Sequence, residues 1–297
     1  MTPPTPRTRR RACRRTTCTV VLISLAACVA TAPPEPVVLD GSSASGHLTP
    51  SAATPYALAM QAIVATMESR LHFPPFRPTL VLCPDRRRLT SALIADGLDP
   101  AYARQAALAL DGVSRAGKVF ANEEALARMP WPGRVRFLAH ELAHNAQDVL
   151  SGGRPVNSDQ WLREGLAEWV SWAVLDAEKL GSFVRARERS RALVHAAITR
   201  GGLPGIAELV DSRQWVSVKA NKHAPPVYAL AFVAVDFLIE RHGLAKVLDY
   251  FRLSASSGDR VGNFAAAFGE SWGAFEASFA DALAAPRVAG PPGGVGE

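Results

Sequence analysis

The pattern of apolar and polar positions predicts two short strands near the start of the folded part and helices over most of the remainder. Residues 77–85 (RPTLVLCPD) contain an apolar run typical of a strand, and residues 113–122 (VSRAGKVFAN) form a second candidate strand. Elsewhere apolar residues recur every three or four positions, the spacing of an amphipathic helix. The predicted helices cover residues 54–71, 87–96, 99–110, 130–150, 160–180, 182–199, 204–211, 226–241, 243–253 and 271–284.

Local start and stop signals define the helix over 130–150. Pro130 and Pro132 favour its first turn, and Gly152 with Gly153 ends it. Ser158 or Asp159 can cap the helix that follows. The order of elements predicts an α+β fold that is mostly helical. We expect a small sheet on the N-terminal side of the helix over 130–150 and a helical subdomain on its C-terminal side.

The first 27 residues are typical of an export signal, because a basic stretch leads into the apolar run CTVVLISLAACVATA. This run is too short for a transmembrane helix. Leu25-Ala26-Ala27-Cys28 resembles a bacterial lipobox, which implies that Cys28 is lipidated and anchors the protein to the cell envelope. The alternative is ordinary cleavage after Ala30-Thr31-Ala32, which leaves a secreted or periplasmic protein; Pro33 disfavours that cut.

Composition divides the rest of the chain into three parts. Residues 28–53 are rich in Pro, Ala, Ser and Thr and predict a disordered tether, residues 54–285 predict one folded domain, and residues 286–297 predict a disordered tail. Cys83 is the one cysteine left in the folded part, so an intrachain disulfide is excluded there. Its apolar surroundings favour a buried residue.

The formal net charge of +6 comes from the leader and not from the folded part. Six arginines lie in the first fifteen residues, and the chain after residue 27 carries 27 basic and 27 acidic residues. A nucleic-acid-binding face needs clustered basic residues, so we expect no nucleic-acid partner. We expect a monomer whose contact with a membrane runs through the lipid at Cys28.

Candidate chemistry lies in residues 136–147 (RFLAHELAHNAQ), which contain His-Glu-x-x-His. His140 and His144 are four apart, so on a helix they face the same side and can bind one metal ion together. Glu141 lies about 100° around the helix from His140. It is near the metal without having to bind it, which suits a general base acting on water.

A catalytic zinc site needs a third protein ligand. The predicted next helix carries Glu164 and Glu168 one turn apart, within WLREGLAEW (residues 161–169). Two acids on one face of a helix otherwise lined by apolar residues need a partner, and a metal with its histidines provides one.

These two motifs resemble those of the gluzincin metallopeptidases, the thermolysin-like enzymes and the aminopeptidases that share their catalytic domain. The family places its ligand glutamate in Trp-Leu-x-Glu-Gly-x-Ala, and here residues 161–167 read WLREGLA, with nineteen residues between His144 and Glu164. The resemblance implies a zincin-like domain holding one Zn²⁺ through His140, His144 and Glu164. It also implies that Glu168 orients a ligand histidine.

Two further positions bear on the comparison. Tyr228 lies 64 residues after Glu164, in a segment similar to the one that brings a tyrosine into the aminopeptidase-like site. Its phenol either hydrogen-bonds the oxyanion or packs in the core. The Gly-x-Met-Glu-Asn motif that holds a free amine on an edge strand is absent, since residues 120–124 read FANEE. Glu123 is the remaining candidate for an amine contact.

The sequence therefore predicts a zinc metallopeptidase that hydrolyses a peptide or protein substrate, with Glu141 as the general base and Tyr228 as a candidate oxyanion donor. The alternative is a catalytically inactive lipoprotein of the same fold that binds peptides or cell-envelope material. Glu141 and all the predicted ligands are present, which favours the enzyme.

Overall fold

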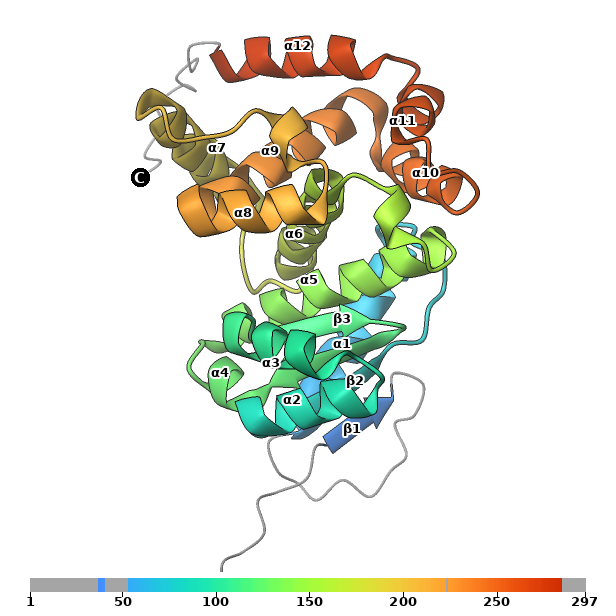
Figure 1. The fold of residues 1–297 in the computed structure, drawn as a ribbon, viewed down its shortest axis with the longest axis vertical. Helices are drawn as coiled ribbons and strands as arrows, with labels where there is room; N and C mark the ends of the chain where they lie inside the picture. Colours follow the sequence, from blue (N-terminus) through green and yellow to red (C-terminus); the bar gives the residue numbers. More distant parts are fainter. Residues whose placement is uncertain (1–36, 41–52, 223, 285–297) are drawn as a thin grey trace, which may run out of the picture. The chain divides into compact units, whose positions relative to one another are not determined.

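The computed structural model describes residues 37–40, 53–222 and 224–284 (Figure 1). The predicted signal peptide over 1–27, Cys28 and the predicted tail over 286–297 lie outside the described residues. The described part is mostly helical with one small sheet, which confirms the α+β prediction. No helix in these ranges combines the length and the apolar character needed to span a membrane.

The sheet contains four strands in the order β1-β2-β4-β3. They are β1 (Val37–Asp40), β2 (Thr79–Cys83), β3 (Gly112–Arg115) and β4 (Lys118–Asn122). β2 and β4 are parallel, and the other neighbours are antiparallel. β1 lies inside the segment that we predicted as a disordered tether, so the tether prediction is wrong for residues 37–40. The run Val-Val-Leu favours a strand, but the Pro-, Ser- and Thr-rich residues around it concealed this signal.

The second predicted strand is a β-hairpin. β3 and β4 pair in antiparallel register, and Ala116 and Gly117 form the two-residue turn between them. Both turn residues have positive φ, 48° at Ala116 and 76° at Gly117, as a type I′ turn requires. The prediction missed the turn because alanine seldom adopts this conformation.

Different helices cover the two faces of the sheet (Figure 1). Val81 and Phe120 pack with the small core under α2 (Arg86–Ala95) and α3 (Pro100–Ala109). Their neighbours Leu80 and Val119 belong to the main core, which also contains residues of α1 (Ala53–Ser69) and α5 (Trp131–Leu150). Since both faces are buried, the inner positions of the central strands, Leu80–Cys83 and Val119–Ala121, are apolar and show no alternation.

The C-terminal part is helical, as predicted, with differences in the weaker elements. Its elements are η1 (Pro155–Asn157), α6 (Gln160–Ala177), α7 (Phe183–Thr199), η2 (Ile206–Leu209), α8 (Ser212–Lys222), α9 (Ala224–His242), α10 (Leu244–Ser254), α11 (Arg260–Phe268) and α12 (Trp272–Ala284). The helix predicted over 204–211 is the short 3₁₀ turn η2. The prediction missed α8, α11 and α4 (Glu123–Ala127), because α8 has few apolar residues and the other two are short.

The motif helices agree with their predicted bounds. α5 begins at Trp131 with Pro132 in its first turn, and α6 begins after Asp159. Asp159 occupies the N-cap position but makes no capping hydrogen bond. Its carboxylate instead accepts a hydrogen bond of 2.9 Å from the Tyr250 hydroxyl. The backbone N–H of Asp159 donates to the oxygen of that hydroxyl at 3.0 Å. This contact fixes the start of α6 against α10.

Candidate metal centre

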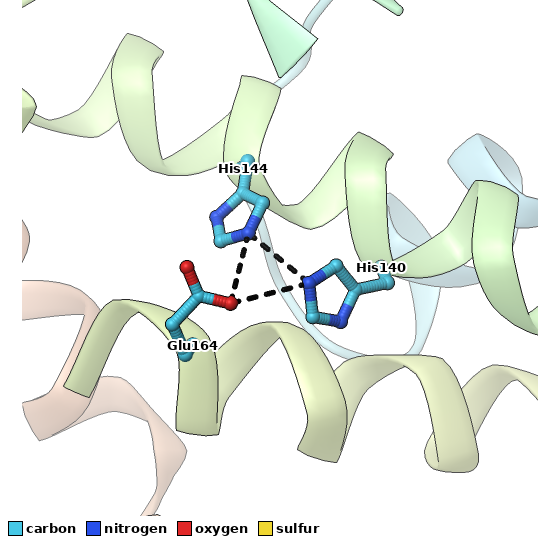
Figure 2. A group of neighbouring side chains, drawn as sticks. All are labelled: His140, His144 and Glu164. Carbon is cyan, nitrogen blue, oxygen red and sulfur yellow. Dashed lines mark hydrogen bonds and ion pairs between the residues drawn. The ribbon is translucent and has the colours of Figure 1, made fainter. Parts of the chain in front are cut away.

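α5 and α6 lie side by side and bring the predicted ligands together. His140 and His144 project from adjacent turns of α5, and Glu164 projects from α6 toward both of them (Figure 2). Nε2 of His140 lies 3.2 Å from Nε2 of His144 and 3.4 Å from Oε2 of Glu164. Nε2 of His144 lies 3.7 Å from the same oxygen. These three side chains form a group that could hold a metal ion.

The spacing of the three ligand atoms fits a small tetrahedral cation. Zinc–ligand bonds of about 2.0–2.1 Å place the ligand atoms of a tetrahedral site about 3.3–3.4 Å apart. The distances of 3.2, 3.4 and 3.7 Å are close to that edge length. The residues present therefore fit a zinc ion in both donor type and spacing.

Glu168 lies where the resemblance expects the partner of a ligand histidine. Its Oε1 is 3.1 Å from Nδ1 of His140, on the side of the ring that faces away from His144. The other carboxylate oxygen accepts from the Arg136 guanidinium, which lies 4.6 Å from the centre of the Trp172 ring. Trp172 thus packs against Arg136, and Arg136 holds Glu168 in place. Neither residue was identified from the sequence as part of the site.

Two glutamines also support the ligands. Nε2 of Gln160 donates to Oε1 of Glu164 at 2.7 Å, and Oε1 of Gln147 lies 3.0 Å from Nδ1 of His144. Glutamine is common on helices and carries no metal-binding signal, so the sequence could not single out either residue. The spacing of Gln147 from His144, one helical turn, is the signal that was available.

The electrostatics of the group favour positive charge at its centre. Burial alone would lower the pKa of His140, but Glu164 and Glu168 outweigh burial and raise it to about 10. Burial opposes ionisation of Glu164, yet His144 and His140 hold the pKa of its carboxyl well below the usual value. Histidines that bind a metal are neutral. The carboxylates of Glu164 and Glu168 then outnumber the single Arg136 beside them, and a divalent cation would offset this excess of negative charge.

Glu141 faces the sheet side of α5, next to the ligands but not among them. Burial raises the pKa of its carboxyl, the two histidines lower it, and a hydrogen bond from the Ser114 backbone lowers it too. Ser114 belongs to β3, and its hydroxyl accepts a hydrogen bond of 2.6 Å from Asn145 on α5. β3 therefore positions the predicted general base through a backbone contact.

Tyr228 lies beside the ligand group. Its ring centre is 6.1 Å from that of His140 and 5.2 Å from that of Trp215 on α8, both with edge-to-face geometry. Burial, followed by the carboxylates of Glu164, Glu168 and Glu141, raises the pKa of the phenol well above its usual value. Tyr228 thus keeps its proton at neutral pH, as the hypothesis of an oxyanion donor requires.

Gly165 explains how α9 approaches the site closely. A Cβ at this position would lie 2.3 Å from the Ala231 carbonyl oxygen and 2.6 Å from Cγ2 of Val235. Both contacts belong to α9, the helix that carries Tyr228. The glycine after the ligand glutamate therefore lets the two helices pack backbone to backbone.

Glu123 takes part in a different group. Its Oε1 accepts from the Tyr56 hydroxyl at 3.3 Å, and the same hydroxyl accepts from Arg134 at 3.2 Å. β4, which ends at Asn122 just before it, pairs with β2 on one side and β3 on the other, so it is not an edge strand. The structure thus gives Glu123 partners other than the metal ligands, and the predicted amine contact has no support in its described interactions.

Comparisons of the chain with protein-family models, with curated proteins and with solved structures found no significant match.

Proposed function

We propose that the chain is a zinc-dependent peptidase of the gluzincin type. The convergence of His140, His144 and Glu164 beside Glu141 carries this proposal. Two imidazoles and one carboxylate are a donor set typical of catalytic zinc, which leaves a coordination position for water or substrate. When bound, zinc polarises a carbonyl group and makes water a better nucleophile at neutral pH.

The residues around the metal have complementary tasks. Glu141 accepts a proton from the attacking water and passes it to the leaving amine. Burial raises its pKa, which brings the carboxyl closer to neutral pH and suits a group that must both take and give a proton. Tyr228, which keeps its proton, donates a hydrogen bond to the oxyanion that forms when the carbonyl is attacked.

An extended peptide is the substrate class that the sheet supports. β3 stands at one end of the strand order and is hydrogen-bonded to β4 only, within the part of the chain that the structure describes. A peptide can add to such an edge through backbone hydrogen bonds. Since Ser114 of β3 also contacts Glu141, a peptide aligned along β3 would lie next to the proposed base.

The test is turnover of a mixed-sequence quenched peptide library, with cleavage sites mapped by mass spectrometry. We expect cleavage by the zinc-loaded protein and a loss on the order of 100-fold or more in Glu141→Gln, which removes the base and keeps the shape of the side chain. Zinc content should be equal in both proteins. A library left intact by the zinc-loaded wild type, with peptides bound but not cut, would establish the non-catalytic binding protein instead.

We also propose that the protein is exported and anchored to the cell envelope by lipid on Cys28. The support is the residue pattern at 25–28. Mass spectrometry of the mature N-terminus tests it. An acylated Cys28 is expected, and Cys28→Ala should abolish membrane retention. An unmodified N-terminus at Pro33 would refute the anchor.

A further inference from the structure

Gln147 has the contacts of a residue that controls His144. It lies one turn after His144 on α5 and is buried, with 1% of its surface exposed. Its Nε2 donates to the backbone carbonyl of Arg163 at 2.8 Å, and its Oε1 lies 3.0 Å from Nδ1 of His144. Both ends of the amide are therefore used, one on each of the two ligand-bearing helices.

The chemistry of these partners fixes the direction of each hydrogen bond. A backbone carbonyl can only accept, so the NH₂ end of Gln147 must face Arg163. The amide oxygen then faces His144 and can only accept, so Nδ1 of His144 must carry a proton. In the neutral ring this leaves the lone pair on Nε2, the atom that faces His140 and Glu164.

The same amide connects the ligands across the helix pair. Arg163, whose carbonyl orients Gln147, directly precedes Glu164 in α6. A shift of α6 along α5 would move Glu164 and this carbonyl together, and the hydrogen bond to Gln147 resists such a shift. One buried side chain thus couples the tautomer of one ligand to the position of another.

A neutral amide suits this position better than a carboxylate. His140 already has the carboxylate of Glu168 as its partner, and Arg136 balances that charge. A second carboxylate behind His144 would add negative charge to a group that already holds Glu141 and Glu164. It would also lie next to Asp148, and burial already raises the pKa of the Asp148 carboxyl. The amide orients the ring without that charge.

We propose that Gln147 is a positioning residue that holds His144 in the Nδ1–H tautomer and thereby prepares Nε2 for the metal. The inference rests on the proposed metal site, but it concerns how the site is built and is independent of whether a peptide is cleaved.

The test compares Gln147→Met and Gln147→Glu with the wild type. Methionine keeps the approximate volume of the side chain and loses both hydrogen bonds, whereas glutamate keeps the acceptor for His144 and loses the donor to Arg163. The measurements are zinc affinity by chelator competition and the His144 tautomer from imidazole ¹⁵N chemical shifts in the zinc-free protein. Asn263→Ala is the control for a general loss of stability, because it removes a buried amide of α11 that donates to the Ser257 backbone carbonyl.

We expect Gln147→Met to bind zinc about 10- to 100-fold more weakly and to lose the uniform Nδ1–H tautomer. Gln147→Glu should keep the tautomer and lie between the other two proteins in zinc affinity, and the control should match the wild type. A purely structural role predicts the opposite order, because methionine is easier to bury than a carboxylate. Equal zinc affinity and an unchanged tautomer in Gln147→Met would overturn the proposal.

Failure of the proposed function gives a different result. If the wild-type protein binds zinc but cleaves no peptide, the proposed function fails, and zinc affinity and the His144 tautomer still test the role of Gln147. If the wild-type protein binds no zinc, the proposal of a zinc-dependent peptidase is wrong. The His144 tautomer in the metal-free wild type and variants then still decides whether Gln147 fixes that ring.

Discussion

The three glutamates of this site share a carboxylate side chain but make different contacts. Glu141, Glu164 and Glu168 are three carboxylates around two histidines, and their contacts separate them. Glu164 faces the Nε2 atoms, Glu168 contacts Nδ1 of His140 from behind, and Glu141 lies on the β3 side. The motif resemblance implies a separate role for each of these carboxylates, and variants of Glu164 and Glu168 test two of those roles.

Removing Glu164 and removing Glu168 should have different consequences for zinc. Glu164→Ala leaves two protein ligands, fewer than a catalytic site needs, so stoichiometric zinc should be lost at ordinary concentrations. Glu168→Ala should weaken zinc affinity or activity about 10- to 100-fold, because it removes the partner of His140. Zinc titration with chelator competition measures both.

The control for this comparison is Glu124→Ala, which removes an exposed carboxylate paired with Arg128. It should bind zinc like the wild type. Tight zinc in Glu164→Ala together with loss of zinc in Glu168→Ala would mean that the ligand is Glu168 and that our assignment is wrong.

Tyr228→Phe should lower kcat while zinc content stays the same. The Tyr228 ring lies beside His140 and its phenol keeps its proton, and removal of one oxyanion donor costs on the order of 100-fold or more in rate. Steady-state kinetics on a peptide cleaved by the wild type provides the measurement. If kcat is unchanged, Tyr228 is a packing residue whose ring merely fills the space between His140 and Trp215.

At the scale of elements, the packing of α6 on α9 decides where Tyr228 lies. Gly165→Ala places a methyl group against the Ala231 backbone and Val235. Overpacking of this kind costs about 1–3 kcal/mol, which outweighs the helix-propensity gain of up to about 1 kcal/mol. We expect lower thermal stability and a larger loss in kcat than in zinc affinity.

The matched control is Gly273→Ala on α12, where an added Cβ meets no atom within 4 Å. It should stabilise the protein by no more than about 0.5 kcal/mol, because alanine is favoured over glycine in a helix but Gly273 lies in the first turn of α12. Stabilisation by Gly165→Ala as well would show that α6 and α9 have room for the methyl group.

The contact between α6 and α10 predicts a pH dependence. Burial, then the Asp159 carboxylate, raises the pKa of Tyr250 above its unfolded value of 10.0. Because the pKa is higher in the folded state, the contribution of Tyr250 to the free energy of unfolding is complete below pH 10. It declines as the pH rises above 10, where Tyr250 ionises in the unfolded chain. Tyr250→Phe should cost about 1.5–3 kcal/mol at pH 7, the value of a hydrogen bond to a charged group.

Denaturant unfolding of wild type and Tyr250→Phe at pH 7 and pH 11 measures this. The stability gap between the two proteins should narrow at pH 11. A gap that is equal at both pH values would show that the hydroxyl of Tyr250 is not protected from ionisation.

How far the sequence predicts each element depends on how much of the signal is local. α5 and α6 have strong periodicity, prolines or a residue type favoured at the N-cap at their starts, and two motifs, and both were predicted within a few residues. β1 was missed because a strand gains its stability from its partner, and β2 is distant in sequence. The β3–β4 turn was missed because alanine seldom adopts the positive φ of Ala116. α8 was missed for a related reason, since its burial depends on Trp215 packing against Tyr228.

The candidate site shows the same division. Ligands that follow a spacing rule, such as His140 and His144, can be recognised in the sequence. Residues that act through a tertiary contact, such as Arg136 on Glu168 or Gln147 on the Arg163 carbonyl, cannot, because nothing in their own neighbourhood requires that contact. Glu123 is a third case, since its partner Tyr56 is distant in sequence and its contact with a substrate amine stays a prediction.

At the scale of the whole molecule, the metal should stabilise the fold without being required for it. Two apolar cores, one on each face of the sheet, hold the described elements together, and the ligand group lies between two helices of the larger core. A protein with such a core differs from small metal-dependent domains, which unfold when the metal is removed. We therefore expect the chelator-treated protein to keep its helical circular dichroism and a cooperative unfolding transition.

Zinc should nevertheless raise the unfolding temperature, because it binds the folded state. At a free zinc concentration about 1,000 times the dissociation constant, the stabilisation is about 4 kcal/mol. For a domain of this size each kcal/mol corresponds to about 2–4 °C, so the expected rise is about 8–16 °C. Thermal unfolding with chelator and with defined zinc measures it, and Glu164→Ala should show little or none of the rise. Unfolding by the chelator alone at room temperature would show that the metal is part of the fold, and an equal rise in Glu164→Ala would show that zinc stabilises the protein from another site.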